Sequence, residues 1–148
     1  MQITSRFTIA AHIITCIDYF RNSETVTSAF LAGSVGVNPV IIRTVMGQLK
    51  DAGIIKSSRG KSGIVLAKSL EEITFLDIYK AVECVSEDGL FHFHEHPNMA
   101  CPIGRNIHAA MAGKLAELEL TLEEKLRQKT MAEVVKDARI EILKTVPQ

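Results

Sequence analysis

The sequence predicts a mainly α-helical protein with one small β-hairpin, a long helix near its end and a shorter last helix. Three observations indicate this fold class. Apolar residues recur every three or four positions over most of the chain, as on one face of a helix. Two β-branched runs, at 54–57 and 64–66, flank a loop with two glycines, a pattern typical of a hairpin. An apolar stripe that continues from Ile107 to Leu126 predicts the long helix.

The first helix is expected to begin at a Ser5 cap and to end near Phe20. It is apolar on two faces, one made by Phe7, Ala10, Ile14 and Ile17 and the other by His12, Cys16 and Phe20. A helix of this kind is either sandwiched between other elements or covered by a partner subunit.

Two short helices are predicted next, joined by a glycine-containing corner at 33–38. Thr27 or Ser28 caps the first of them, and Asn38 and Pro39 open the second with a capping residue and a proline at the first helical position. Gly53 lies where a helix end tolerates positive φ. The apolar stripe of the second helix comprises Ile41, Ile42, Val45, Met46 and Leu49.

The hairpin follows this second helix directly, and its tip carries Arg59 and Lys61. A helix pair turning on glycine and followed by a basic hairpin is the outline of a winged helix-turn-helix.

The rest of the chain predicts a helix capped by Thr74, an ordered loop at 86–104, a long helix from Arg105 to about Gln128, and a last helix from Met131 to about Lys144. At 1.5 Å per residue the long helix would extend roughly 36 Å, too far for so small a domain to cover. We therefore expect it to pair with a symmetry mate. The expected dimerisation residues are Ile107, Met111, Leu115, Leu118 and Leu122. Three parts result: a winged helix-turn-helix (1–70), a connecting helix and sensor loop (71–104), and the dimerisation and C-terminal helices (105–148).

Charge is distributed unevenly, although the chain is neutral overall. Residues 1–68 hold 8 Lys and Arg against 3 Asp and Glu, whereas residues 69–148 hold 9 against 14. A basic first half fits binding to phosphates, with a chance partition of charges as the alternative. The sequence offers no membrane-length apolar run and no evident signal cleavage site, so we expect a cytoplasmic protein. It offers no catalytic motif either, so we expect no enzyme.

Several segments together resemble the IscR/NsrR/CymR group of bacterial transcriptional regulators, the Rrf2 family. They are TSRFTIAAHII, GVNPVIIRTVMGQLKDAGIIKSSRGKSGIVLAK, EITFLDIYKAVE, the long helix and TMAEVVKD. The resemblance implies a homodimer that reads a pseudo-palindromic operator on double-stranded DNA, with a sensing element in the loop before the long helices.

The cysteines depart from the pattern of the cluster-binding relatives, which carry three in that loop at C-x5-C-x5-C spacing. Here Cys101 matches the last of them, whereas Glu95 and Gly89 occupy the other two positions. An iron–sulfur cluster on three local thiolates is therefore excluded. The stretch HEHPNMACPIG instead resembles the YwnA-like single-cysteine branch of the family.

The candidate DNA contacts follow from helix-turn-helix geometry, in which the start of the second helix meets base edges. Arg43 is the residue able to bind guanine through two hydrogen bonds. Arg59 and Lys61 suit phosphate or minor-groove contacts, and Ser5, Arg6 and Ser28 lie near helix N-termini that could meet phosphates. The expected set is Ser5, Arg6, Ser28, Asn38, Pro39, Val40, Arg43, Thr44, Arg59 and Lys61. The alternative is that these are ordinary solvated residues.

Cys101 is the candidate sensor, because a helix N-terminus and Arg105, with the nearby histidines, would favour its thiolate. The family resemblance suggests Cys16 of the partner subunit as a disulfide acceptor. The alternative is an inert thiol, which is our interpretation of Cys84.

Three histidines, His92, His94 and His96, alternate along the loop and in an extended segment would lie on one side. With Cys101 they could bind a metal, but Phe91 and Phe93 would then have to be buried on the other side. We expect hydrogen-bonding structure there and no cofactor.

The predicted function is a homodimeric transcriptional regulator, a repressor whose DNA affinity changes with a signal at the 86–104 loop, through thiol redox chemistry at Cys101. The alternative is a dimeric winged-helix scaffold or metal-binding module without specific DNA binding.

Overall fold

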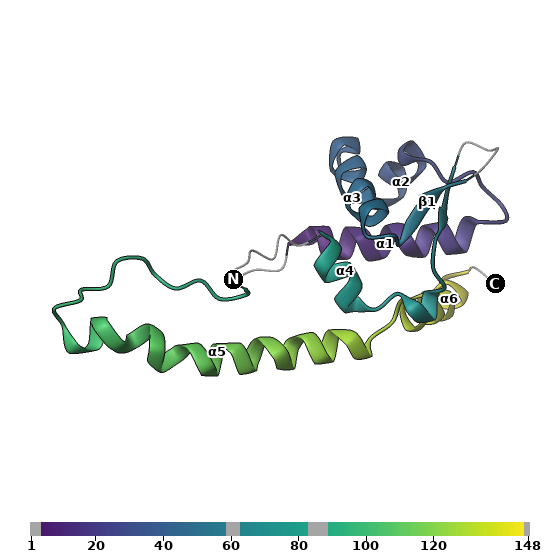
Figure 1. Ribbon diagram of the computed structural model, residues 1–148. Coiled ribbons are helices and arrows are strands. Elements are labelled where there is room, and N and C mark those ends of the chain that lie inside the picture. The colour runs from purple at the N-terminus through teal and green to yellow at the C-terminus, as the bar shows by residue number, and fades with distance from the viewer. Residues whose placement is uncertain (1–3, 59–62, 83–88, 147–148) are drawn as a thin grey trace.

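The computed structural model describes residues 4–58, 63–82 and 89–146. Its elements in chain order are α1 (Ser5–Phe20), α2 (Ser28–Val35), α3 (Pro39–Asp51), β1 (Ile55–Ser57), β2 (Ile64–Leu66), the 3-10 turn η1 (Leu70–Glu72), α4 (Phe75–Val82), α5 (Pro102–Gln128) and α6 (Met131–Thr145). Figure 1 shows α2, α3 and the hairpin above α1, and the long α5 extending away below. The predicted fold class, mainly helical with a small hairpin, is confirmed.

Helix α1 is the centre of the fold, because it contacts α2, α3 and β2 as well as α4 and α6. Its residues Ile13, Ile14 and Ile17 are fully buried among these elements, so the helix is sandwiched within its own chain. The predicted cap was one residue too late. Thr4 has extended backbone and accepts a hydrogen bond from Arg6 N–H (3.3 Å), whereas Ser5 is already helical.

Helices α2 and α3 form the predicted pair, bent by 114°, within the range of helix-turn-helix motifs. Gly36 provides the corner with φ of 74°, a value that a residue with a Cβ adopts at a cost. Thr27 caps α2 by accepting from Phe30 N–H (3.2 Å), which settles the choice between Thr27 and Ser28.

Helix α3 is buried along Ile42, Val45, Met46 and Leu49. Its predicted stripe was wrong at Ile41, which remains 41% exposed because the four buried positions already fill the contact with α1 and α4. The helix ends in a Schellman motif: Gly53, at φ of 72°, donates to Lys50 O (2.9 Å), and Ile54 N–H donates to Leu49 O (3.0 Å).

The wing is an antiparallel pair in which Ile55 faces Leu66 and Ser57 faces Ile64. It is joined to the helices by Ile64 N–H, which donates to Val26 O (3.0 Å). The tip, 59–62, lies outside the described residues.

The two C-terminal helices differ in how they contact the rest. Helix α6 packs on α1, and its Met131 is fully buried. Backbone hydrogen bonds from Phe75 N–H to Lys129 O and from Met131 N–H to Ile73 O (both 2.8 Å) tie the α5–α6 junction to the start of α4. Helix α5 begins at Pro102, three residues earlier than predicted, because proline suits the first helical position. Over the described residues no single helix is long and apolar enough to cross a membrane, and the bent α2–α3 pair meets that test by length and composition alone.

Candidate DNA-binding surface and sensor segment

The start of α3 presents the predicted contact residues to solvent. Asn38, Pro39, Val40, Arg43 and Thr44 are all exposed. Asn38 Oδ1 accepts from Val40 N–H (2.8 Å) and so fixes the first turn, and Thr44 Oγ1 donates to Val40 O (3.0 Å). Helical spacing puts positions 40, 43 and 44 on one face. This end of the helix therefore offers a rigid, exposed edge.

Two side chains give this edge its chemistry. Arg43 makes no hydrogen bond or ion pair with any described residue, so its five N–H donors are available. Val40 is 61% exposed, and Ile41, which the sequence placed in the core, lies exposed beside it. Exposed aliphatic groups on such a helix can contact the thymine methyl group, and an arginine can bind guanine. Positions 42, 45, 46 and 49 already make a complete apolar stripe on one face of the helix. Recognising this in the sequence would have indicated that Ile41 is left exposed.

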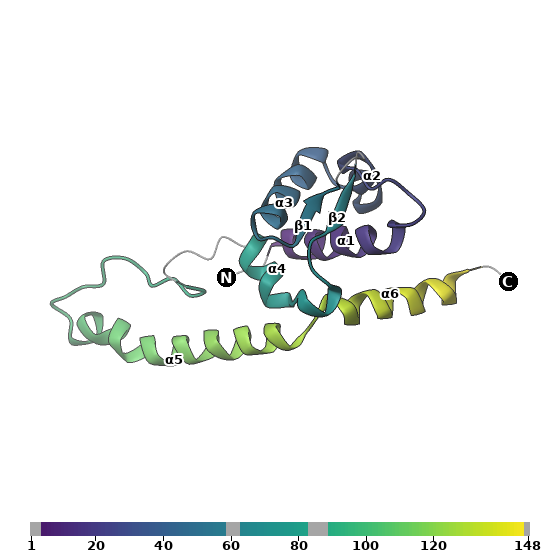
Figure 2. The same cartoon turned by 45° about the vertical axis from the view of Figure 1, so that its right-hand side comes forward.

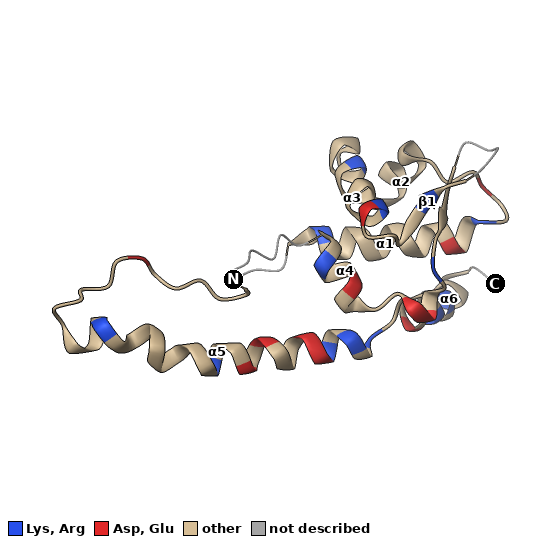
Figure 3. Ribbon diagram, in the orientation of Figure 1, with Lys and Arg blue, Asp and Glu red and all other residues tan. Residues whose placement is uncertain are grey.

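The other residues predicted to contact DNA differ in how exposed they are. Ser5 is exposed, whereas Arg6 and Ser28 are half-buried in the first turns of α1 and α2. Arg59 and Lys61 lie outside the described residues. Figure 3 shows Lys and Arg on α3 and β1, and acidic residues along the second half of α5 and on α6.

The described part of the sensor loop, 89–101, runs along α5 in the opposite direction, from Glu119 back to Gly104. Leu90 N–H donates to Glu119 Oε1 (3.2 Å) at its beginning. Further on, the rings of Phe93 and His94 lie 4.5 and 5.1 Å from the ring of His108. The described part of the loop is therefore a strap on α5, which the sequence did not predict.

The strap ends in a tight turn. Cys101 N–H donates to Asn98 O (3.1 Å), and Ala100 N–H donates to Asn98 Oδ1 (3.0 Å). The carbonyl of Asn98 packs against Gly104, where a Cβ would overlap its oxygen. The close packing of this turn against α5 thus depends on the absence of a Cβ at Gly104.

Cys101 is the N-cap residue of α5 and is half-buried. Its thiol makes no capping hydrogen bond of ordinary geometry. The backbone N–H groups of Gly104, first, and Ile103 nevertheless lower the pKa of the thiol, against a smaller opposing effect of burial. The N–H groups at the start of α5 are therefore the cause of the lowered pKa.

Cys16 lies in a different environment. It is buried, and its Sγ is 3.3 Å from Ser34 Oγ, which is 3.0 Å from His12 Nε2. Figures 1 and 2 show the first turn of α5, which Cys101 caps, far from α1, the helix that carries Cys16. Cys84 lies outside the described residues.

The three histidines do not share one side of an extended strand. His96 has φ of 60°, which breaks the extended run, and Phe93 contacts the same ring as His94. His92, His94 and His96 are all exposed. Within 4–58, 63–82 and 89–146, no three His, Cys, Asp or Glu side chains come together as metal ligands would.

Helix α5 exposes a long apolar surface. None of its residues is buried, and its contact with the rest of the chain is mainly through α4. Met111 and Leu118 are exposed, the latter at 56%, and Ile107, Leu115 and Leu122 are half-buried. Of the five predicted dimerisation residues, two are thus exposed and three are half-buried in the single chain.

Known proteins share this architecture. The chain is 34% identical over 134 residues to YwnA of Bacillus subtilis, named as a candidate helix-turn-helix transcriptional regulator, covering 90% of this chain and 97% of that protein. A crystal structure of a candidate transcriptional regulator from Lactobacillus plantarum is 25% identical, with a TM-score of 0.72 over 93% of this chain and 91% of that one. CymR of B. subtilis, described as its global cysteine regulator, shares the fold at a TM-score of 0.66 and 16% identity, over 92% of this chain and 97% of that one.

Residues 3–137 match the sequence profile of the Rrf2 family, described as iron-dependent transcriptional regulators. The described residues do not fit an iron site, because they bring no three ligating side chains together. The relatives are DNA-binding regulators and not enzymes. With the winged helix-turn-helix, the strap and the long helix in place, this chain belongs to the Rrf2 family of transcriptional regulators.

Proposed function

We propose that this chain is a homodimeric repressor that reads a pseudo-palindromic operator and changes its DNA affinity through the 86–104 loop, by thiol chemistry at Cys101. The observation that carries the proposal is the exposed start of α3, where Arg43 has no partner among the described residues. An arginine held on a capped helix and left unpaired is suited to a base edge.

Each element has a part in this proposal. Arg43 binds guanine, and Val40 and Ile41 contact thymine methyl groups. Arg59 and Lys61 of the wing, with Ser5, Arg6 and Ser28 at the helix starts, bind phosphates and set the register. The α5 stripe pairs with that of a second copy, so that two α3 helices meet half-sites about 34–36 Å apart.

The dimer supplies what one chain lacks. A stripe over a helix of 27 residues, about 40 Å long, would otherwise remain in water. Leu118→Asp should shift the protein from dimer to monomer in sedimentation and abolish operator binding. Leu120→Asp is a matched control, because Leu120 is exposed on α5 but lies off the stripe. A Leu118→Asp protein that stayed dimeric would contradict this interface.

The signal acts where the strap meets α5. With hydrogen peroxide, the Cys101 thiolate attacks one oxygen and breaks the O–O bond, forming a sulfenic acid and releasing the other oxygen as hydroxide. Condensation with a second thiol then forms a disulfide and water. Cys16 of the partner subunit is the proposed acceptor, and its burial requires α1 to open first.

DNA reading is tested by selecting an operator from random duplexes and measuring binding at several salt concentrations. Arg43→Ala should weaken the selected operator by about 1–3 kcal/mol and random DNA far less. Replacing thymine by uracil opposite Val40 and Ile41 should weaken wild-type binding through loss of the methyl group. Lys50→Ala, an exposed change at the far end of α3, serves as control. If no sequence is selected and binding is insensitive to salt, the scaffold alternative is correct.

Sensing is tested on the same operator, with protein that is fully reduced or treated with mild peroxide. Oxidation should release DNA from wild type and Cys16→Ser should block only the disulfide, seen on non-reducing gels. Cys101→Ser should retain DNA under both conditions. If wild type and Cys101→Ser respond alike and metal analysis finds no bound ion, Cys101 is structural.

A further inference from the structure

A groove separate from the DNA-binding surface lies between the end of α1, the base of the wing with η1, and α6. It measures about 800 Å³, within the range of small-molecule sites. Figures 1 and 2 show α1 between α3 and α6, and no residue of α3 lines the groove. Neither DNA contact nor the strap uses it.

One wall of the groove is apolar. Leu66 and Leu70 come from the wing base and η1, and Val135, Ile140 and Leu143 come from α6. Leu143 is 76% exposed and Ile140 is 43% exposed, so two large aliphatic side chains of this wall face water. An apolar ligand would bury them with a favourable free energy.

The rim of the groove is cationic. Arg21, Lys68, Lys136 and Arg139 line it, against two acids, Asp18 and Glu71. Lys68 and Lys136 make no hydrogen bond or ion pair within the described parts of the chain. The rim therefore carries a net charge of +2 with two ammonium groups that lack a counter-ion.

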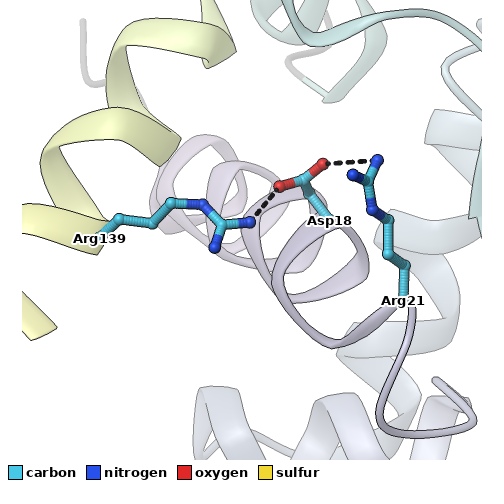
Figure 4. Close-up of polar contacts among 3 residues, drawn as sticks. All are labelled: Asp18, Arg21 and Arg139. Atoms are coloured by element: carbon cyan, nitrogen blue, oxygen red, sulfur yellow. Dashed lines mark hydrogen bonds and ion pairs between the residues drawn. The ribbon is translucent and has the colours of Figure 1, made fainter.

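Asp18 does not supply that counter-ion, because its carboxylate already pairs with Arg139 and Arg21. Its side chain is 8% exposed, and it accepts a hydrogen bond from Arg139 Nη2 (3.1 Å) with Arg21 Nη1 at 3.6 Å. Figure 4 shows the carboxylate between the two guanidinium groups. Arg139 also lies 5.2 Å from the centre of the Tyr19 ring. The pair fixes α6 to α1 and so makes the floor of the groove rigid.

We propose that this groove binds a small amphipathic organic anion, with its apolar part on the α6 wall and its charge at Lys68 and Lys136. A neutral apolar molecule would leave the ammonium groups unpaired, and an inorganic anion would leave Leu143 and Ile140 in water. The inference concerns binding alone, so it does not depend on the proposed operator or on Cys101.

The test uses the full chain and decanoate as the probe, with decanol as a neutral molecule of the same length and inorganic phosphate as an anion without an apolar part. Binding is followed by titration calorimetry and by amide NMR shifts. Decanoate should shift amides of α6 and residues 66–71 and bind more tightly than decanol or phosphate. Shifts spread over α5, or equal affinity for decanol, would overturn the proposal.

Two variants locate the site. Lys136→Gln should weaken decanoate about 3-fold, as for loss of one exposed ion pair, and Leu143→Asp about 10-fold or more. Lys114→Gln, the same change as Lys136→Gln but on α5, should leave affinity unchanged. Sedimentation of Leu143→Asp tests the other occupant: a loss of dimer would mean that a second copy of the chain fills the groove, and would overturn the proposal. Circular dichroism of each variant verifies the fold.

Discussion

The winged half of the molecule, from α1 to β2, and the long helix α5 are stabilised in different ways. In the described residues each α-helix except α5 buries at least one side chain. Helix α1, for example, buries Ile13, Ile14 and Ile17 against the elements around it. The longest helix, α5, buries none. The winged half obtains its free energy of folding from its own core, whereas α5 within the single chain has only local helix interactions, its contact with α4 and its strap.

The strap adds to this difference in buried contacts between the winged half and α5. It is attached to α5 by a few specific contacts: Leu90 to Glu119, Phe93 and His94 to His108, and Asn98 to Gly104. Few buried apolar contacts mean a small free energy of local opening. The proposed signal at Cys101 would therefore act on a segment that is held by few contacts.

The largest expected effect is in the core. Ile42→Ala removes a fully buried side chain of α3 and should lower the free energy of unfolding by about 2–5 kcal/mol, measured in urea. Ile41→Ala, the same change one position earlier, should lower it by less than about 1 kcal/mol while weakening operator binding. Equal losses in the two variants would mean that α3 is rotated relative to this structure.

The two glycines of α5 should respond in opposite directions. Gly104→Ala places a Cβ against the Asn98 carbonyl and should cost about 1–3 kcal/mol of local stability. Gly113→Ala has open space around it and should stabilise the helix by about 0.5–1 kcal/mol. Hydrogen exchange of the Cys101 and Arg105 amides should accelerate in the first variant and not in the second. Identical behaviour would show that the turn does not pack on α5.

The ion pair between α1 and α6, in which Asp18 is buried and Arg139 is partly exposed, should contribute more than a fully exposed one. Arg139→Met should cost about 1–2 kcal/mol, at the lower end for a buried charge, because Arg21 remains near Asp18. Lys144→Met breaks the exposed pair with Glu141 and should cost less than about 1 kcal/mol. A double-mutant cycle with Asp18→Asn isolates the interaction, and a coupling near zero would contradict it.

The smallest effect is on titration. The thiolate of Cys101 reacts with iodoacetamide, so in the Cys16→Ser, Cys84→Ser background the alkylation rate should reach its midpoint below the ordinary thiol pKa. In urea the midpoint should return to the ordinary value. Because the folded-state pKa is lowered, the stabilisation is present above the unfolded-state pKa and is lost as pH falls through the lowered value. Identical midpoints in both states would contradict the effect of the helix end.

Most elements were predictable because their signals are local. Asn38 with Pro39, Thr74 and Gly53 mark helix boundaries through neighbours within four residues, and the structure places each boundary there. Two boundaries were misjudged: Thr4 and not Ser5 caps α1, and α5 begins at Pro102 and not at Arg105.

The candidate site was predictable only in part. The exposed start of α3 follows from the corner and cap, but the exposure of Ile41 depends on the angle at which α3 meets α1 and α4. The lowered pKa of Cys101 was predicted from its place before a helix, and the backbone N–H groups of Gly104 and Ile103 are its cause. Helical periodicity limits the candidate buried residues to one face of a helix, and tertiary packing decides which residues of that face are buried.

The sequence by itself determined the order and type of the elements, the capped α3 with its exposed Arg43, and the apolar stripe of α5, because helix periodicity and caps involve residues within a turn or two of each other. The tertiary structure alone decided the pairing of Asp18 with Arg139, the junction of Lys129 and Met131 with α4, and the groove that results. These contacts join residues far apart along the chain, and their geometry follows from how whole helices pack to bury their apolar faces.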